Sequence, residues 1–161
     1  MSLVETVATT AAAVCAGATG GVYVAFSTMV MPALNTRAAS ESVAVMQRIN
    51  VRAVRPPFMT LFFGGALASV VAGVASLTSE TPSMMRLTGA ALSLASFGLT
   101  VTVNVPLNNA LARLPAGTGS GAGPDNLGGW RAFERPWTRA NSMRAALALA
   151  GAAALAGSLA G

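Results

Sequence analysis

The chain has 161 residues, of which 53% are hydrophobic and only 9% are charged. Soluble domains carry about 25% charged residues, so a fully water-exposed surface is excluded and lipid must solvate much of the chain. The sequence has no histidine and one cysteine, Cys15. This excludes histidine-based zinc and iron sites, a Ser-His-Asp triad and an intrachain disulfide, and we expect no metal and no cofactor.

Four apolar stretches are long enough to cross a bilayer, which takes about 20 residues. The first three contain no charged residue and cover about residues 6–34, 56–79 and 87–108. The fourth, about 138–160, has arginine at its start and is only just long enough. These stretches predict an all-α integral membrane protein, an up-down four-helix bundle built from one domain over residues 1–161.

The connections between these spans differ in charge. All ten basic residues are arginines, and nine of them, counting Arg144, lie in the first and third connections, while the second holds only Arg86. Because arginine-rich connections stay in the cytoplasm, we expect a multi-pass protein of the cell membrane with both termini outside. Arginines beside apolar spans anchor a helix in lipid. The net charge of +5 therefore indicates the bilayer as partner, and no nucleic acid.

The third connection contains a glycine-rich segment, Gly117 to Pro124, after Leu114-Pro115. This composition predicts a flexible loop over about residues 115–129. The residues that follow, from Trp130 to Arg144, are rich in arginine and tryptophan, as is typical of a membrane–water interface.

The third span ends with two asparagines that flank a proline. Asn104 and Asn108 are four residues apart and share one helix face. Pro106 cannot donate to the carbonyl of Thr102, so the helix is expected to bend or end there. Amides at membrane depth are costly unless they have partners. They either satisfy the freed backbone or line a polar pocket, and the sequence leaves both readings open.

The fourth span begins with Trp137, Asn141 and Arg144, which form one stripe if the helix is continuous from Trp137. Pro136 fits the first turn of such a helix, which places Trp130 on the approach to it. Tryptophan and arginine are common at the interface. Arg144 lies a turn deeper, however, and an intramembrane arginine normally faces the protein interior and has a partner.

In an up-down bundle, the ends of spans one and three and the starts of spans two and four lie in the same leaflet. Phe26 of the first span and Arg48 of the first connection therefore come close to the asparagines and the Trp/Asn/Arg stripe. Such a site is cationic, rich in amides and walled by aromatic rings. This combination suits a flat aromatic ligand that bears a phenolate or carbonyl oxygen.

With these motifs the chain resembles the anthrone oxygenase-like family of small four-helix membrane proteins, a domain of unknown function. The resemblance extends over nearly the whole chain. It rests on the glycine-rich first helix that runs into Phe26, on Asn-x-Pro-x-Asn at 104–108, and on Trp-x(3)-Asn-x(2)-Arg from Trp137. It implies the membrane fold. From the few members that look like oxygenases, it also implies oxidation of polyketide anthrones to anthraquinones without metal or flavin.

The first functional hypothesis is a cofactor-independent oxygenase whose partners are the bilayer, a flat aromatic small molecule and O₂. The catalytic candidates hold the substrate oxyanion in a low-dielectric site; they are Arg144, Asn104, Asn108 and Asn141. The substrate-binding candidates contact its rings, with Phe26 and Trp137 on either side; they are Trp137, Trp130, Phe26 and Arg48.

The alternative is a non-catalytic membrane binding module, or a small accessory subunit of a larger membrane complex. Its partner is then another membrane protein or a second copy of the chain. The chain carries no distinctive catalytic signature, and each motif also has an interfacial or structural explanation. A transporter is disfavoured, because the spans lack the acidic residues of proton and cation sites.

Overall fold

The computed structural model describes residues 1–115 and 124–160, and these residues form helices and short connections without any strand. Two of the elements, labelled η, are short π-helical segments within longer helices. In chain order the elements are α1 (Leu3–Ala25), η1 (Phe26–Val30), α2 (Met31–Asn35), α3 (Ala39–Ala53), α4 (Phe58–Leu77), α5 (Met84–Leu99), η2 (Thr100–Asn104), α6 (Val105–Ala112) and α7 (Pro124–Gly157). The prediction of an all-α chain is confirmed over this part of the sequence.

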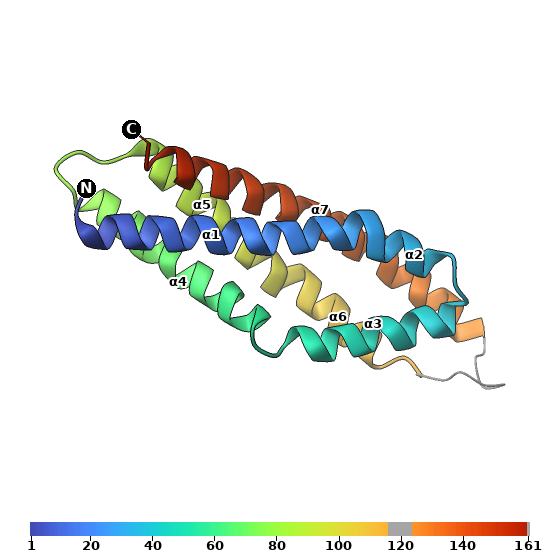
Figure 1. Ribbon diagram of the computed structural model, residues 1–161. Helices are drawn as coiled ribbons and strands as arrows, with labels where there is room; N and C mark the ends of the chain where they lie inside the picture. Colours follow the sequence, from blue (N-terminus) through green and yellow to red (C-terminus); the bar gives the residue numbers. More distant parts are fainter. Residues whose placement is uncertain (116–123, 161) are drawn as a thin grey trace.

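The four long helices α1, α4, α5 and α7 lie side by side in a closed ring. α1 packs against α4 and α7, and α5 packs against the same two helices. Figure 1 shows the N-terminus, the C-terminus and the α4–α5 connection at one end of the molecule, and α2, α3 and α6 toward the other. The two ends are therefore built differently, and α3 covers only one of them.

Three helices of the described part are long and apolar enough to cross a membrane, which indicates a membrane protein. They extend over Leu3–Asn35, Phe58–Leu77 and Met84–Ala112. The sequence predicted four spans. α7 does not reach the same level of hydropathy, because its apolar half begins with the polar residues Asn141 and Arg144.

The helices approach most closely where side chains are smallest. Gly89 of α5 and Gly151 of α7 face each other, and a Cβ added at Gly89 would lie 2.9 Å from the Gly151 carbonyl oxygen. A Cβ at Gly65 of α4 would lie 2.8 Å from the Cβ of Cys15 on α1. Such contacts join helices through van der Waals packing, which replaces the hydrophobic effect in lipid.

A proline follows each π-helical segment, separated from it by one residue. In η1 the N–H of Met31 donates to Phe26 O, and Pro32 follows; in η2 the N–H of Val105 donates to Thr100 O, and Pro106 follows. A proline ring clashes with the carbonyl four residues earlier in an α-helix. The wider π turn relieves that clash. The helix predicted to bend or end at Pro106 therefore continues to Ala112.

α7 is longer than the sequence predicted. It starts at Pro124, so residues 124–129 belong to a helix, and of the loop predicted over 115–129 the residues 116–123 lie outside the described part. The Asn126 side chain is buried and its amide donates to the Pro115 carbonyl at 3.3 Å, which fixes the first turn of α7.

The sequence predicted Pro136 in the first turn of the fourth helix. In the structure Pro136 lies inside α7, about three turns after its start. The reason is the packing of the residues around it. Trp130, Phe133 and Trp137 are buried in one hydrophobic cluster with side chains of α2, α3 and α6, whereas Pro136 itself is exposed. Burial of three aromatic rings outweighs the single hydrogen bond that the proline removes.

Candidate functional site

Arg144 is a buried cation in the interior of the helix ring. It is 8% exposed. Its Nε and Nη2 donate to Asn141 Oδ1 at 3.0 and 2.7 Å, and its Nη1 donates to Thr100 Oγ1 at 3.3 Å. The guanidinium carbon lies 4.0 Å from the centre of the Tyr23 ring. We call these four residues, Tyr23, Thr100, Asn141 and Arg144, the Arg144 cluster.

All partners of Arg144 within this cluster are neutral. The ion pairs formed by the described residues, Arg37–Glu41 and Arg86–Glu5, do not involve it. Hydrogen bonds and ring faces stabilise a buried cation but leave its charge uncompensated. The arrangement therefore favours a negatively charged or strongly polarised oxygen nearby.

Asn141 holds Arg144 in place. It is fully buried, and its amide donates to the Tyr23 carbonyl oxygen at 2.6 Å and to Ser27 Oγ at 2.7 Å. Because this amide is committed to α1, its oxygen points toward the guanidinium. One asparagine thus connects α7 with α1 and orients the charge.

Asn104 and Asn108 lie beside Trp137 and not against Arg144. The Asn104 amide donates to the Trp137 carbonyl oxygen at 3.4 Å, and the indole Nε1 of Trp137 donates to Asn108 Oδ1 at 2.8 Å. Trp137 is also the residue that links them to the cluster, since the guanidinium carbon of Arg144 is 5.5 Å from its ring centre. The four predicted polar residues therefore form two pairs at the same end of the bundle, Asn104 and Asn108 on Trp137, and Asn141 with Arg144.

The aromatic candidates occupy two positions. The ring centres of Phe26 and Trp137 are 5.9 Å apart, so the two rings touch and a ligand ring between them would have to separate them. Trp130 lies further toward the α3 end, where its indole Nε1 donates to Asn35 Oδ1 at 3.0 Å. Arg48 is exposed on α3 and takes part in none of the cluster's hydrogen bonds.

Trp130 also lines an open cleft of about 500 Å³ near the N-terminal end of α7. Asn35 bridges Trp130 and Glu134, since its amide donates to Glu134 Oε1 at 3.0 Å. The other residues that line the cleft are mostly basic or apolar: Arg37, Ala39, Leu127, Arg131 and Arg135. The cleft is more than two helical turns of α7 away from Arg144.

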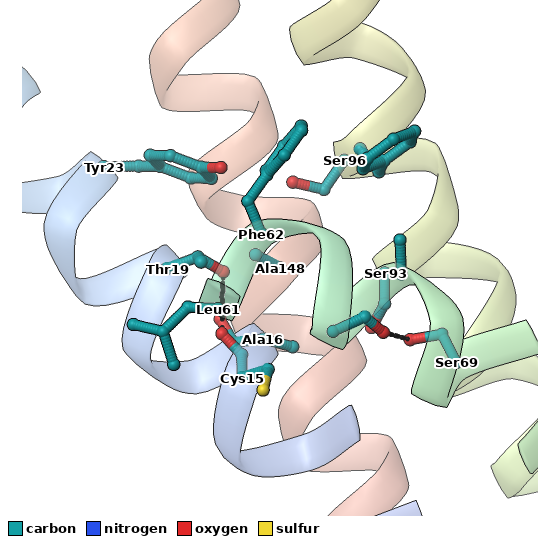
Figure 2. Close-up of a pocket in the computed structure, with 13 residues that line it drawn as sticks. Cys15, Ala16, Thr19, Tyr23, Leu61, Phe62, Ser69, Ser93, Ser96 and Ala148 are labelled. Carbon is teal, nitrogen blue, oxygen red and sulfur yellow. Dashed lines mark hydrogen bonds between the residues drawn. The ribbon is translucent and has the colours of Figure 1, made fainter. Parts of the chain in front are cut away.

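A second, smaller cavity of about 30 Å³ lies between the four long helices (Figure 2). Its polar lining consists of hydroxyl groups and one thiol, from Cys15, Thr19, Tyr23, Ser69, Ser93 and Ser96. Phe62 of α4 and Phe97 of α5 form its aromatic wall. We call this space the four-helix cavity. Tyr23 belongs to both the cavity and the Arg144 cluster.

Sequence reasoning did not identify Tyr23, Thr100 or Asn35 as site residues. For Asn35 a signal is present, since Thr-x(3)-Pro-x(2)-Asn occurs twice, at 28–35 and at 102–109. The repeat marks two equivalent π segments before a proline. Tyr23 is the one tyrosine of the chain, but nothing in its neighbourhood in the sequence predicts a contact with a residue 121 positions further on.

The fold and the buried cation define a small helical membrane protein with a polar cluster in its interior. The sequence matches the anthrone oxygenase family over residues 58–154, more than half of the chain, and the chain belongs to this family. The matched part covers α4 to most of α7 and includes the asparagine and Trp/Asn/Arg motifs, whereas the first helix with Phe26 lies outside it. No curated protein and no solved structure matched the sequence.

Proposed function

We propose that the protein is a four-helix integral membrane oxygenase that oxidises a flat phenolic or anthrone-type substrate with O₂ and without a cofactor. Membership of the anthrone oxygenase family supports the reaction class. The observation that carries the proposal is Arg144, buried among neutral partners with no carboxylate paired to it among the described residues. Such a charge stabilises an oxyanion more strongly than it would in water.

The reaction needs little from the protein. An anthrone loses a proton from the carbon opposite its carbonyl, because the resulting anion is fully aromatic. This anion gives one electron to O₂, and the radical and superoxide combine to a peroxide at that carbon. Loss of the remaining C–H proton and of hydroxide then leaves the second carbonyl. The sum is anthrone plus O₂ to anthraquinone plus water.

Arg144 acts in the first step of this scheme. By attracting the substrate oxygen it favours the anion over the neutral anthrone and so raises the fraction that can react with O₂. Asn141 fixes the guanidinium, and Asn104 and Asn108 fix Trp137 beside it. The apolar helices also favour O₂, which dissolves better in hydrocarbon than in water.

In the bilayer we place α7 as the fourth span and both termini outside. Residues 138–157 of α7 have the length of about 30 Å that a crossing needs. Seven of the ten arginines then lie in the two connections on the cytoplasmic side, and Arg139 and Arg144 lie in the first two turns of the fourth span at the same end. Arg86, on the other side, is neutralised by its buried pair with Glu5 at 2.9 Å.

The test compares Arg144→Gln with the unchanged protein. In detergent micelles under air, 1,8-dihydroxyanthrone should be converted to its anthraquinone with a kcat/KM about 100-fold lower in the variant, since loss of one preorganised charge costs about 3 kcal/mol. Glutamine can still bond Asn141, which preserves the fold. Arg139→Ala, an exposed arginine on the same helix, is the control and should match the unchanged protein. A rate equal to that of empty micelles excludes the proposed activity.

A second candidate is a non-catalytic binding module or a small accessory subunit. It is supported by the hydrogen bonds of Asn141, Arg144 and the Asn104 amide, which join these predicted polar residues to one another or to the backbone and leave only the Asn104 Oδ1 without a partner among them. It predicts that another membrane protein, or a second copy of the chain, co-purifies in mild detergent at fixed stoichiometry. A monodisperse single chain that turns over anthrone would contradict it.

A further inference from the structure

The four-helix cavity is connected to the lipid-facing surface by a row of aromatic rings. Phe62 and Phe97 lie stacked, with ring centres 4.5 Å apart and planes inclined by 25°. Both line the cavity on one side and are only half-buried. Phe63, 58% exposed, lies edge-on to both. A continuous aromatic surface therefore leads from the outer face of α4 and α5 to the cavity.

We propose that the four-helix cavity is the binding site for the rings of a flat aromatic ligand that enters from the lipid between Phe62 and Phe97. The cavity of about 30 Å³ has room for about one water molecule, so the ligand must open it. A flat ring inserted between two stacked rings replaces one ring–ring contact by two. Because of this exchange, separating Phe62 from Phe97 to admit the ligand costs little free energy.

The remaining walls also suit an inserted ring. Ala16, Gly65, Ala66 and Ala148, from three different helices, face the cavity with little or no side chain. Apart from Leu61 and Tyr23, these walls therefore hold no bulky group besides the phenylalanines. The serine hydroxyls close to them are bonded to helix backbones: Ser69 donates to Gly65 O of its own helix at 2.8 Å, and Ser96 donates to Arg144 O of α7 at 2.8 Å. They present the ligand with a nearly apolar surface.

Tyr23 supplies the polar end of this site. Figure 2 shows its hydroxyl and that of Ser96 directed toward the middle of the lining, beside Phe62. Tyr23 is 3% exposed, and the face of its ring contacts the guanidinium of Arg144. A ligand oxygen at the Tyr23 hydroxyl would lie next to the positive charge. The ligand class is therefore a fused-ring phenol or ketone.

If the ligand is the substrate, this inference rests on the proposed function and names the cavity as the place where the substrate binds. Binding at the site is tested without measuring turnover. The probe is 1,8-dihydroxyanthraquinone, which is already fully oxidised. Its saturable binding is measured by absorbance in lipid nanodiscs, with empty nanodiscs subtracted for partition into lipid. We expect one probe per chain.

Ser69→Val fills the cavity, because Ser69 is buried and points into it. It should raise the Kd of the probe at least tenfold. Gly64→Val is the matched control: it places the same side chain on α4, at a position where an added Cβ meets no atom within 4 Å beyond its chain neighbours and its own helix backbone, and should change the Kd less than twofold. Circular dichroism and a monodisperse profile show that both variants are folded.

Tyr23→Phe tests the polar end. It removes one hydroxyl and keeps the ring on Arg144. The Kd for the dihydroxyanthraquinone should rise about fivefold, the usual effect of losing one hydrogen bond, while the Kd for anthracene, which has no oxygen, stays unchanged. Phe62→Ala should speed association of either ligand at least threefold. Leu67→Ala, an exposed residue of α4 outside both the cavity lining and the aromatic row, should not.

The outcomes separate the site from the reaction. Binding that is equal in Ser69→Val and the unchanged protein overturns the site, even if anthrone turnover is found. Saturable binding lost in Ser69→Val supports the site, even if no anthrone is oxidised by any form. Partition identical to that of empty nanodiscs overturns the site, and an equal response of anthracene and the dihydroxyanthraquinone to Tyr23→Phe overturns the assignment of its polar end.

Discussion

Asn141 is the side chain on which the position of Arg144 depends. Its oxygen accepts two of the three guanidinium hydrogen bonds, and its amide donates to the Tyr23 carbonyl and to Ser27. An aspartate at this position would neutralise Arg144. The amide orients the cation without consuming its charge, which is what a site for a transient oxyanion requires.

Replacement of Asn141 should therefore be far more damaging than replacement of Asn108. Asn141→Ala leaves a buried guanidinium without two of its acceptor contacts and should lower the free energy of unfolding by about 3 kcal/mol or more. Asn108→Ala removes one bond, from the Trp137 indole, at a half-buried position and should cost about 1 kcal/mol. Thermal unfolding followed by circular dichroism in detergent measures both. Equal losses would contradict the central role of Asn141.

The sequence predicted which polar residues gather at this end of the bundle better than it predicted their hydrogen-bond partners. Asn141 and Arg144 are one helical turn apart, so their contact follows from spacing alone. Which helix they face does not, because Tyr23 and Thr100 come from distant segments and reach Arg144 only through tertiary packing. The four-helix cavity escaped prediction for the same reason, since each of its walls is an ordinary apolar stretch.

At the scale of the helix, the regular α-helical hydrogen-bond pattern changes where prolines occur. Before Pro32 and Pro106 the backbone widens into η1 and η2, and Thr28 and Thr102 bond back to the carbonyls four residues earlier, each at 2.8 Å. The long apolar helices were predictable from hydropathy. The π-helical widening before each proline was not, because it depends on how the backbone relieves the proline clash and not on hydropathy.

Pro136 gives this argument a test. It lies inside α7 at an exposed position, and an alanine there would restore the missing bond to the carbonyl of Ala132 without touching the aromatic cluster. Pro136→Ala should raise the free energy of unfolding by about 1–3 kcal/mol. Pro124→Ala, at the first residue of the same helix, should have little effect, because the N–H there has no helical partner. Chemical unfolding in micelles compares them, and a destabilised Pro136→Ala would show that the proline shapes α7.

For the whole molecule, the two ends differ in how their charges are handled. At the end with the termini, Arg86 is buried and paired with Glu5, which also caps α1 through the Ser2 N–H at 2.7 Å. At the other end the arginines of α3 and of the first half of α7 are exposed, and only Arg144, in the second half of α7, is buried. The charge asymmetry visible in the sequence is thus increased by folding, since the one arginine on the sparse side is neutralised.

This asymmetry predicts the orientation in the membrane, with the α4–α5 connection outside and the α2–α3 connection in the cytoplasm. Two threonines, both exposed and both in connections, serve as a matched pair: Thr81 between α4 and α5, and Thr36 between α2 and α3. In a Cys15→Ala background, Thr81→Cys should react with a membrane-impermeant maleimide in intact cells. Thr36→Cys should react only after the membrane is permeabilised. The reverse pattern would place the Arg-rich end outside, and reaction of both in intact cells would contradict the bilayer crossing of α4, the apolar helix between the two positions.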